Sequence, residues 1–178
     1  MKRLLGLLIG TLLLSSCVTA DYSSDNRTIA NNKYSNAEIG LTLQFPASWE
    51  AKLDQIYGSD TVELVALAPP EQNYSAEVYV QIEARKGTDL AAILDTVALE
   101  VKADIPDLGQ YHSDIKDLDG KEYGEISYTT TSRGNLLKYK QDLIIRSGKH
   151  IWVSYVDLAS RFDQNTDFTS ISQSMTIE

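Results

Sequence analysis

The sequence predicts an α+β domain in which a mostly antiparallel sheet of about six or seven strands is covered by two helices. Apolar and polar residues alternate with a period of two in seven segments, and an apolar stripe with helical spacing occurs in two others. Short turn signals separate most consecutive strand segments, which favours hairpins and therefore antiparallel pairing. The expected order is three strands, a helix, four strands and a helix.

The first half of this pattern comprises three strands and the first helix. Pro46 ends the first strand and Pro69 ends the second, since proline cannot donate to a strand ladder. The helix begins after Gly87, with Thr88 as the expected N-cap. The strands are expected near 41–45, 62–66 and 78–84, and the helical stripe consists of Leu90, Ile93, Leu94, Val97 and Val101.

The second half contains four strands and the last helix. The dipeptide Asp119-Gly120 is typical of a two-residue hairpin turn. Alternation in the last long strand places Ile151 and Val153 on one face and Trp152 on the other. The strands are expected near 115–118, 121–131, 137–145 and 151–156, and the helix near 165–174, with Phe168, Ile171 and Met175 on one stripe.

Composition limits the chain to a single folded domain of ordinary size. It has 178 residues, of which 43% are hydrophobic and 23% charged, values typical of globular proteins. With 16 basic and 25 acidic residues, its formal net charge is −9, which argues against nucleic-acid binding because phosphate contacts need a basic surface. The single cysteine excludes an internal disulfide framework and a cysteine-based zinc cluster.

The amino terminus has the pattern of an export signal. Lys2 and Arg3 precede an apolar stretch that ends in Leu-Ser-Ser-Cys at Cys17. This ending resembles the bacterial lipobox, which implies that Cys17 is lipidated and becomes the first residue of the mature chain. The alternative is a simple signal peptide with an incidental cysteine. Val18, in a position where aspartate would favour inner-membrane retention, favours an outer-membrane anchor facing the periplasm if the host is Gram-negative.

The expected organisation has three parts. Residues 1–16 form the signal peptide, residues 17–36 the lipidated cysteine and a flexible tether, and residues 37–178 one globular domain. The tether is inferred because residues 18–36 are polar, rich in Ser, Asn and Asp, and without sustained periodicity.

Several segments together resemble the PsbP-like family. An aromatic strand runs into Pro46 and Trp49, residues 144–152 resemble the long central hairpin of that family, and residues 168–177 resemble its closing helix. The resemblance covers about residues 34–178 and implies an α/β/α sandwich. It also implies a protein-binding role, since known members bind proteins and none is a well-established enzyme. It carries over no catalytic residue.

A search for chemistry finds no catalytic, cofactor or metal site. His112 is expected in an exposed loop and His150 as a solvated turn residue, and neither has metal-ligand spacing. No serine-nucleophile elbow or phosphate-binding glycine loop is present. Aromatic side chains on the strands are expected either to pack in the core or to form a partner surface, for which the candidates are Trp152, Tyr139 and Tyr155.

These observations predict a lipid-anchored, non-enzymatic envelope lipoprotein that acts as a protein-interaction module. Its expected partners are the membrane, through the lipid on Cys17, and an envelope protein. Three alternatives stay open: a lipoprotein that binds a small ligand or a divalent metal, an unrecognised hydrolase, and, in a cyanobacterial host, a photosystem II assembly factor.

Overall fold

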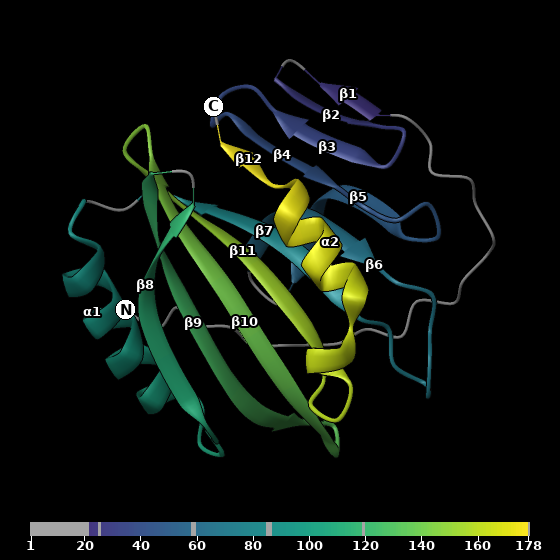
Figure 1. Cartoon of the computed structure of the whole chain (residues 1–178). Coiled ribbons are helices and arrows are strands. Elements are labelled where there is room, and N and C mark those ends of the chain that lie inside the picture. The colour runs from purple at the N-terminus through teal and green to yellow at the C-terminus, as the bar shows by residue number, and fades with distance from the viewer. Residues whose placement is uncertain (1–21, 25, 58–59, 85–86, 119, 178) are drawn as a thin grey trace.

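The computed structural model describes residues 22–24, 26–57, 60–84, 87–118 and 120–177, which form two β-sheets and two α-helices (Figure 1). The large sheet has seven strands in the order β5-β6-β7-β11-β10-β9-β8, and all neighbouring strands are antiparallel. The predicted antiparallel sheet is confirmed. Its strands are β5 (Glu50–Tyr57), β6 (Asp60–Leu67), β7 (Glu77–Glu83), β8 (Tyr111–Leu118), β9 (Lys121–Ser132), β10 (Asn135–Arg146) and β11 (Lys149–Leu158).

A second, small sheet was not expected. It has five strands in the order β1-β2-β3-β4-β12, again with antiparallel neighbours. The strand predicted near 41–45 belongs to this small sheet rather than to the large one. The strands are β1 (Tyr22–Ser24), β2 (Arg27–Ala30), β3 (Lys33–Asn36), β4 (Leu41–Gln44) and β12 (Thr176–Ile177).

The small sheet corrects the expected tether. Residues 22–24 and 27–36 lie largely in strands, and β3 pairs with β4 along its whole length. The hairpin between β2 and β3 turns at Asn31 and Asn32, which have positive φ angles of 52° and 58°. Asparagine tolerates this conformation, which a two-residue hairpin turn requires. The turn sets Ile29 opposite Tyr34, and both side chains are buried.

Both helices lie close to where the apolar stripes place them. α1 (Leu90–Asp104) is capped by Asp89, whose side chain accepts a hydrogen bond from the Ala92 backbone, so the expected cap at Thr88 is one residue early. α2 (Thr166–Ser174) follows the 3-10 turn η1 (Phe162–Gln164) and is capped by Asn165. Trp49 Nε1 donates to Asp167 Oδ2 at 2.9 Å and ties the start of β5 to α2.

The large sheet separates two apolar cores, which gives three layers. One core joins the α1 stripe to the sheet face that carries Trp152. The other joins the α2 stripe and the small sheet to the opposite face, which carries Ile151 and Val153. The two predicted faces of β11 are thus confirmed, and the helices cover opposite sides of the sheet, as an α/β/α sandwich requires (Figure 1).

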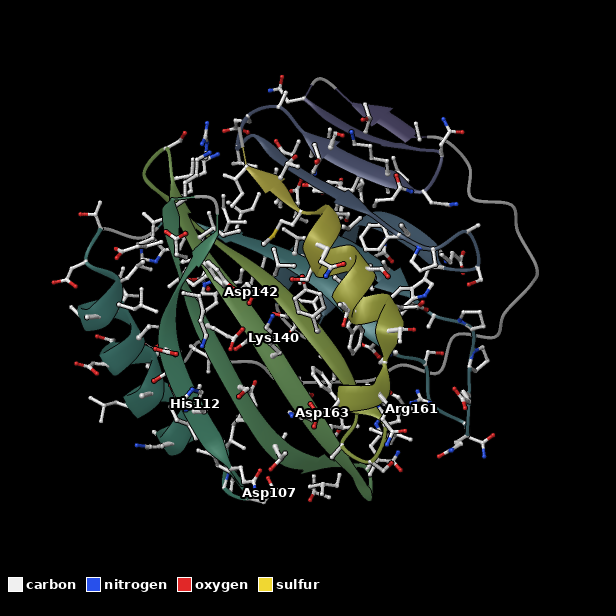
Figure 2. All side chains as sticks on the ribbon, viewed as in Figure 1. Asp107, His112, Lys140, Asp142, Arg161 and Asp163 are labelled. Atoms are coloured by element: carbon white, nitrogen blue, oxygen red, sulfur yellow. The ribbon has the colours of Figure 1, made fainter. Side chains whose placement is uncertain are left out.

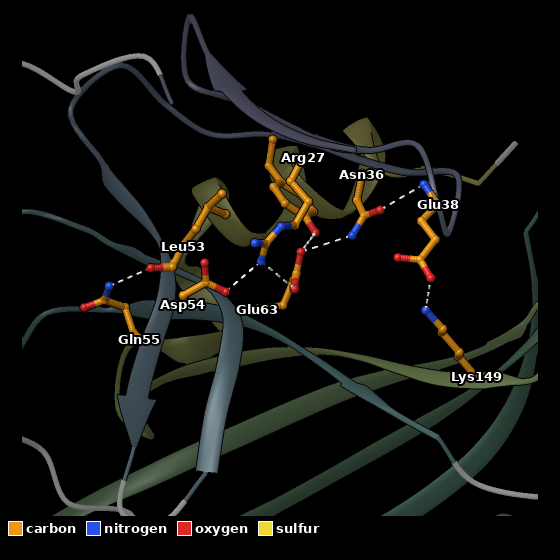
Figure 3. A network of polar contacts seen from close by, with 9 residues as sticks. Arg27, Asn36, Glu38, Leu53, Asp54, Gln55, Glu63 and Lys149 are labelled. Atoms are coloured by element: carbon orange, nitrogen blue, oxygen red, sulfur yellow. Dashed lines mark hydrogen bonds and ion pairs between the residues drawn. The ribbon is translucent and has the colours of Figure 1, made fainter. Parts of the chain in front are cut away.

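A polar network joins the small sheet to β6 (Figure 3). Glu63 Oε1 accepts hydrogen bonds from Tyr34 Oη and Asn36 Nδ2, both at 3.0 Å, and Glu63 Oε2 lies 3.2 Å from Arg27 Nη1. Arg27 Nη1 also lies 2.6 Å from Asp54 Oδ1 on β5. One carboxylate therefore binds three side chains from β2 and β3, which fixes these strands to the domain.

Strand β5 was not predicted from the sequence, which is a second difference. Its ladder with β6 passes from the Leu53–Leu64 pair to the Gln55–Val62 pair across Asp54, which has a φ of 53°. Residues 51–56 still alternate between half-buried and exposed positions, but Gln55 takes a half-buried position and Ile56 an exposed one. The sequence therefore lacks the apolar alternation that identifies a strand, and Ile56 lies 77% exposed on this edge strand.

Candidate functional site

One half of the large sheet lies uncovered on the side of α2. α2 packs against β4 and, through Phe168, against Tyr155 of β11, and Figure 1 shows that β8, β9 and β10 extend beyond it. The strand register places the following alternate residues on that side, and we call them the open face: His112, Asp114 and Lys116 on β8, Glu125, Ser127 and Thr129 on β9, and Leu136, Lys138 and Lys140 on β10.

Charged side chains of both signs pair across the open face. Lys140 Nζ lies 3.2 Å from Glu125 Oε2 and 3.3 Å from Asp142 Oδ1. Lys116 Nζ lies 2.7 Å from Asp114 Oδ2 on the same strand. The surface therefore alternates positive and negative groups, and it has no large region of a single sign.

Asp142 lies at the inner edge of the open face, beside Lys140, on the part of the large sheet next to α2 (Figure 2). It is 0% exposed, and neither carboxylate oxygen accepts a hydrogen bond from within the described part of the chain. Burial raises the pKa of Asp142 to about 6, although Lys140 opposes this rise. Burial alone would lower the pKa of Lys140, but Asp142 and Glu125 together raise it.

The raised pKa of Asp142 predicts that stability falls as pH increases. Between the usual aspartate pKa of about 4 and the folded value of about 6, the unfolded chain loses the proton first, so unfolding becomes easier. A difference of about two pKa units corresponds to about 3 kcal/mol. We expect Asp142→Asn to remove this part of the pH dependence, measured by urea unfolding between pH 4 and 7. Asp95→Asn, on the exposed side of α1, is the control; a wild-type slope in Asp142→Asn would contradict the assignment.

A cavity of about 280 Å³ opens between the large sheet and α2, next to this charged cluster. Its floor is formed by Lys140 and Tyr155, and its walls by Phe162, Phe168, Thr169 and Ser172. Figure 2 shows Lys140 on the sheet beside α2 and Asp163 on η1, below it in this view. Asp163 Oδ1 lies 2.6 Å from Lys138 Nζ, so an ion pair borders the cavity on that side.

The two histidines occupy different surroundings. His112 is exposed, as expected, although it lies on β8 rather than in a loop. His150 is 1% exposed, and its Nε2 lies 3.1 Å from the Gly87 carbonyl oxygen, so the expectation of a solvated turn residue is wrong. The turn itself is at Ser147 and Gly148, and His150 points back under the segment that precedes α1. Among the described residues, no three His, Cys, Asp or Glu side chains are grouped to hold a metal.

The three aromatic candidates do not form a partner surface. Trp152, Tyr139 and Tyr155 are 7%, 1% and 1% exposed. Trp152 and Tyr139 lie in the core under α1, where Tyr139 stacks on Tyr128 with ring centroids 4.9 Å apart. Tyr155 lies on the opposite face, against Phe168 of α2. The packing interpretation of these aromatics, left open above, is the one that the structure supports.

The charged cluster was missed by the sequence analysis. Lys138, Lys140 and Asp142 alternate with apolar residues along β10 and were assigned only to the polar side of a strand. The sequence shows this alternation, but it does not show that Asp142 is fully buried whereas Lys138 stays partly exposed. Cys17, the predicted lipidation site, lies outside the described residues. Within those residues, no helix combines the length and the apolar character needed to cross a bilayer.

Comparison with known proteins identifies the fold. No protein-family model and no curated protein sequence matches the chain. Among solved structures, it is similar to the cyanobacterial PsbP protein CyanoP of Synechocystis sp. PCC 6803, with a TM-score of 0.59 and 16% identity over 96% of this chain and 99% of that one. It is also similar to LpqN of Mycobacterium tuberculosis, involved in cell envelope biogenesis (TM-score 0.57, 17% identity, 77% and 82% covered).

A third similar structure is PA94 of Pseudomonas aeruginosa, a protein of unknown function. Its TM-score is 0.53 and its identity 13%, over 72% of this chain and 96% of that one. At these identities the comparisons show a shared fold. The domain is a PsbP-like α+β sandwich, as the resemblance of residues 34–178 implied.

Proposed function

We propose that this chain is a lipid-anchored, non-enzymatic envelope lipoprotein whose PsbP-like domain docks on an envelope protein through the open face. The observation that carries this proposal is the open face itself. Helices and the small sheet cover most of the large sheet, whereas β8, β9 and β10 present paired charges to solvent on the α2 side (Figure 2). Complementary charges on a partner would align the two proteins and speed their encounter.

The fold supports a role without chemistry of its own. The resemblance to PsbP-like proteins brings no catalytic residues, and LpqN, a structure of the same fold, is described as involved in cell envelope biogenesis. For a Gram-negative host we propose the outer membrane as the location, with the domain in the periplasm, because Val18 stands where aspartate would favour inner-membrane retention.

The distance between the anchor and the domain is short. Tyr22, the first residue of β1, follows Cys17 by five positions. At about 3.3–3.6 Å per residue, this connection reaches at most about 18 Å. A lipid on Cys17 would therefore hold the small sheet close to the bilayer, and we propose a partner that lies at or near the same membrane.

The anchor itself is tested by labelling. We expect the wild-type protein to incorporate a clickable palmitate analogue and Cys17→Ser to incorporate none, because the thiol is the attachment atom in the lipobox pattern. The variant should also leave the membrane fraction. Ser16→Ala, which keeps a small residue before the cysteine, is the matched control. Wild-type protein without label would contradict the anchor.

Docking is tested with a set of charge-removing variants. We expect the combined variant His112→Ala, Asp114→Ala and Lys116→Ala to reduce at least about tenfold the yield of a partner cross-linked in intact envelopes. These side chains lie on the edge strand β8, where truncation should leave the fold intact. Asp95→Ala, Lys102→Ala and Asp104→Ala remove the same number of exposed polar groups from α1.

The two sets of variants are compared in the same assay. Equal loss in both sets, or retention of the partner by the β8 set, would contradict docking through the open face. Because the contact is proposed to be electrostatic, the wild-type yield should also fall as the salt concentration rises.

A further inference from the structure

We propose that the cavity beneath α2 binds a single sugar ring, a neutral pyranose, independently of partner docking. The cavity measures about 280 Å³. This volume is just below the range of about 300–1,000 Å³ that is common for ligand sites, so one ring fits and a larger ligand would extend outside.

Two buried polar groups in and beside the cavity, the hydroxyl of Tyr155 and the carboxylate of Asp142, lie near each other without a well-formed hydrogen bond. The hydroxyl of Tyr155 lines the floor, its residue is 1% exposed, and it makes no hydrogen bond within the residues that the structure covers. Next to it, both carboxylate oxygens of Asp142 are also without hydrogen bonds there, apart from the ion pair with Lys140. Buried polar groups are nearly always satisfied in native proteins, so a group that can donate and accept is expected at this place.

The lining fits a hydroxyl-rich ligand better than an ion. Its two charged residues, Lys140 and Asp163, are already paired, the first with Glu125 and Asp142 and the second with Lys138. A charged ligand would therefore meet no uncompensated opposite charge. Hydroxyl and amide groups, which both donate and accept, remain on the α2 side of the cavity at Thr169, Ser172 and Gln173.

Aromatic rings complete the site. Tyr155, Phe162 and Phe168 border the cavity, and Phe168 contacts both other rings, with centroid distances of 5.6 Å to Tyr155 and 5.1 Å to Phe162. Such rings offer apolar surface to the C–H groups of a pyranose, while a few polar groups fix its orientation. Water alone would satisfy the polar groups but would gain nothing from the rings.

The test is a titration of the ¹⁵N-labelled mature chain, in detergent, followed by NMR. The probes are N-acetylglucosamine, as a free sugar, and its β1,4-linked dimer, as the end of a glycan chain. We expect saturable shifts of the amides in residues 168–173 and in the facing parts of β10 and β11. Tighter binding of the dimer than of the free sugar would identify the end of a glycan chain as the natural ligand. Equal affinities would identify a free sugar, and either result supports a pyranose site. No saturable shift with either probe would mean that the cavity holds only water and would overturn the proposal.

Two variants and one control locate the binding. Tyr155→Phe removes a hydroxyl that lies beside Asp142 and Ser172 but forms no well-placed hydrogen bond with either, so it should weaken sugar binding at least about tenfold while the unfolding midpoint stays close to that of the wild type. Thr169→Trp, at an exposed position of α2, should block the cavity. Tyr139→Phe removes a hydroxyl on the opposite face of the sheet and should bind as the wild type does.

The same variants define the results that would overturn the sugar proposal. Unchanged binding in Tyr155→Phe overturns the proposal, and if that variant fails to fold, unchanged binding in Thr169→Trp overturns it. Loss of partner cross-linking in the β8 variants leaves the sugar titration unaffected, so failures of docking and of sugar binding are distinguishable.

Discussion

Deletion of residues 1–36 should abolish the cooperative unfolding transition of the domain. The deletion removes β1, β2 and β3, leaves β4 without its hairpin partner, and empties the buried sites of Ile29 and Tyr34. Emptying each such site costs about 2–5 kcal/mol, so the two together cost about 4–10 kcal/mol, which is comparable with the roughly 5–15 kcal/mol that stabilises a typical domain. Circular dichroism during thermal unfolding measures the effect.

The matched control begins at Tyr22 and retains all three strands. It should unfold cooperatively, with a midpoint close to that of the mature chain. The deletion also frees Glu63 from Arg27, Tyr34 and Asn36, so part of its effect is a carboxylate that loses three partners. If the chain beginning at Ala37 unfolded as the control does, residues 22–36 would be the tether that their composition suggests.

Phe45→Ala should destabilise the domain by about 3–5 kcal/mol, the usual cost of emptying a buried phenylalanine site. Phe45 follows β4, is 2% exposed, and stacks on Trp49 with ring centroids 6.4 Å apart. It belongs to the core shared by the small sheet, α2 and the large sheet. Urea unfolding midpoints measure the loss.

Thr42→Ala is the comparison for this variant. Thr42 is partly exposed on β4, where it pairs with Thr176 of β12, so its truncation should cost less than about 1 kcal/mol. An equal or larger loss for Thr42→Ala would mean that the faces of β4 are reversed.

The sequence predicted the strands in which apolar and polar residues alternate regularly, and the helices that carry an apolar stripe. The segments around β7, β9, β10 and β11 were identified by their alternation, and the two faces of β11 were assigned as they lie. The stripes of α1 and α2 identified the residues that each helix buries. These elements depend on contacts that repeat along the element, so the pattern is visible locally.

Elements that depend on distant contacts were missed. Glu63 on β6 binds side chains of the small sheet. Nothing in the polar sequence of residues 22–36 shows that Tyr34 and Asn36 will donate hydrogen bonds to this distant carboxylate. The Asn31-Asn32 pair between Ile29 and Tyr34 was the local signal that could have identified the hairpin. His150 was misplaced for the same reason, since the Gly87 segment covers it from far along the chain.

The most direct test of docking through the open face is photo-cross-linking from single positions in the native envelope. Leu136 lies on the open face and is 54% exposed, whereas Leu99 lies on α1 and is 70% exposed. A photoreactive phenylalanine at each position samples the two faces of the same molecule with similar access. We predict a discrete cross-linked species from Leu136 and none from Leu99; the same product from both positions, or a product from Leu99 alone, would contradict the proposed function.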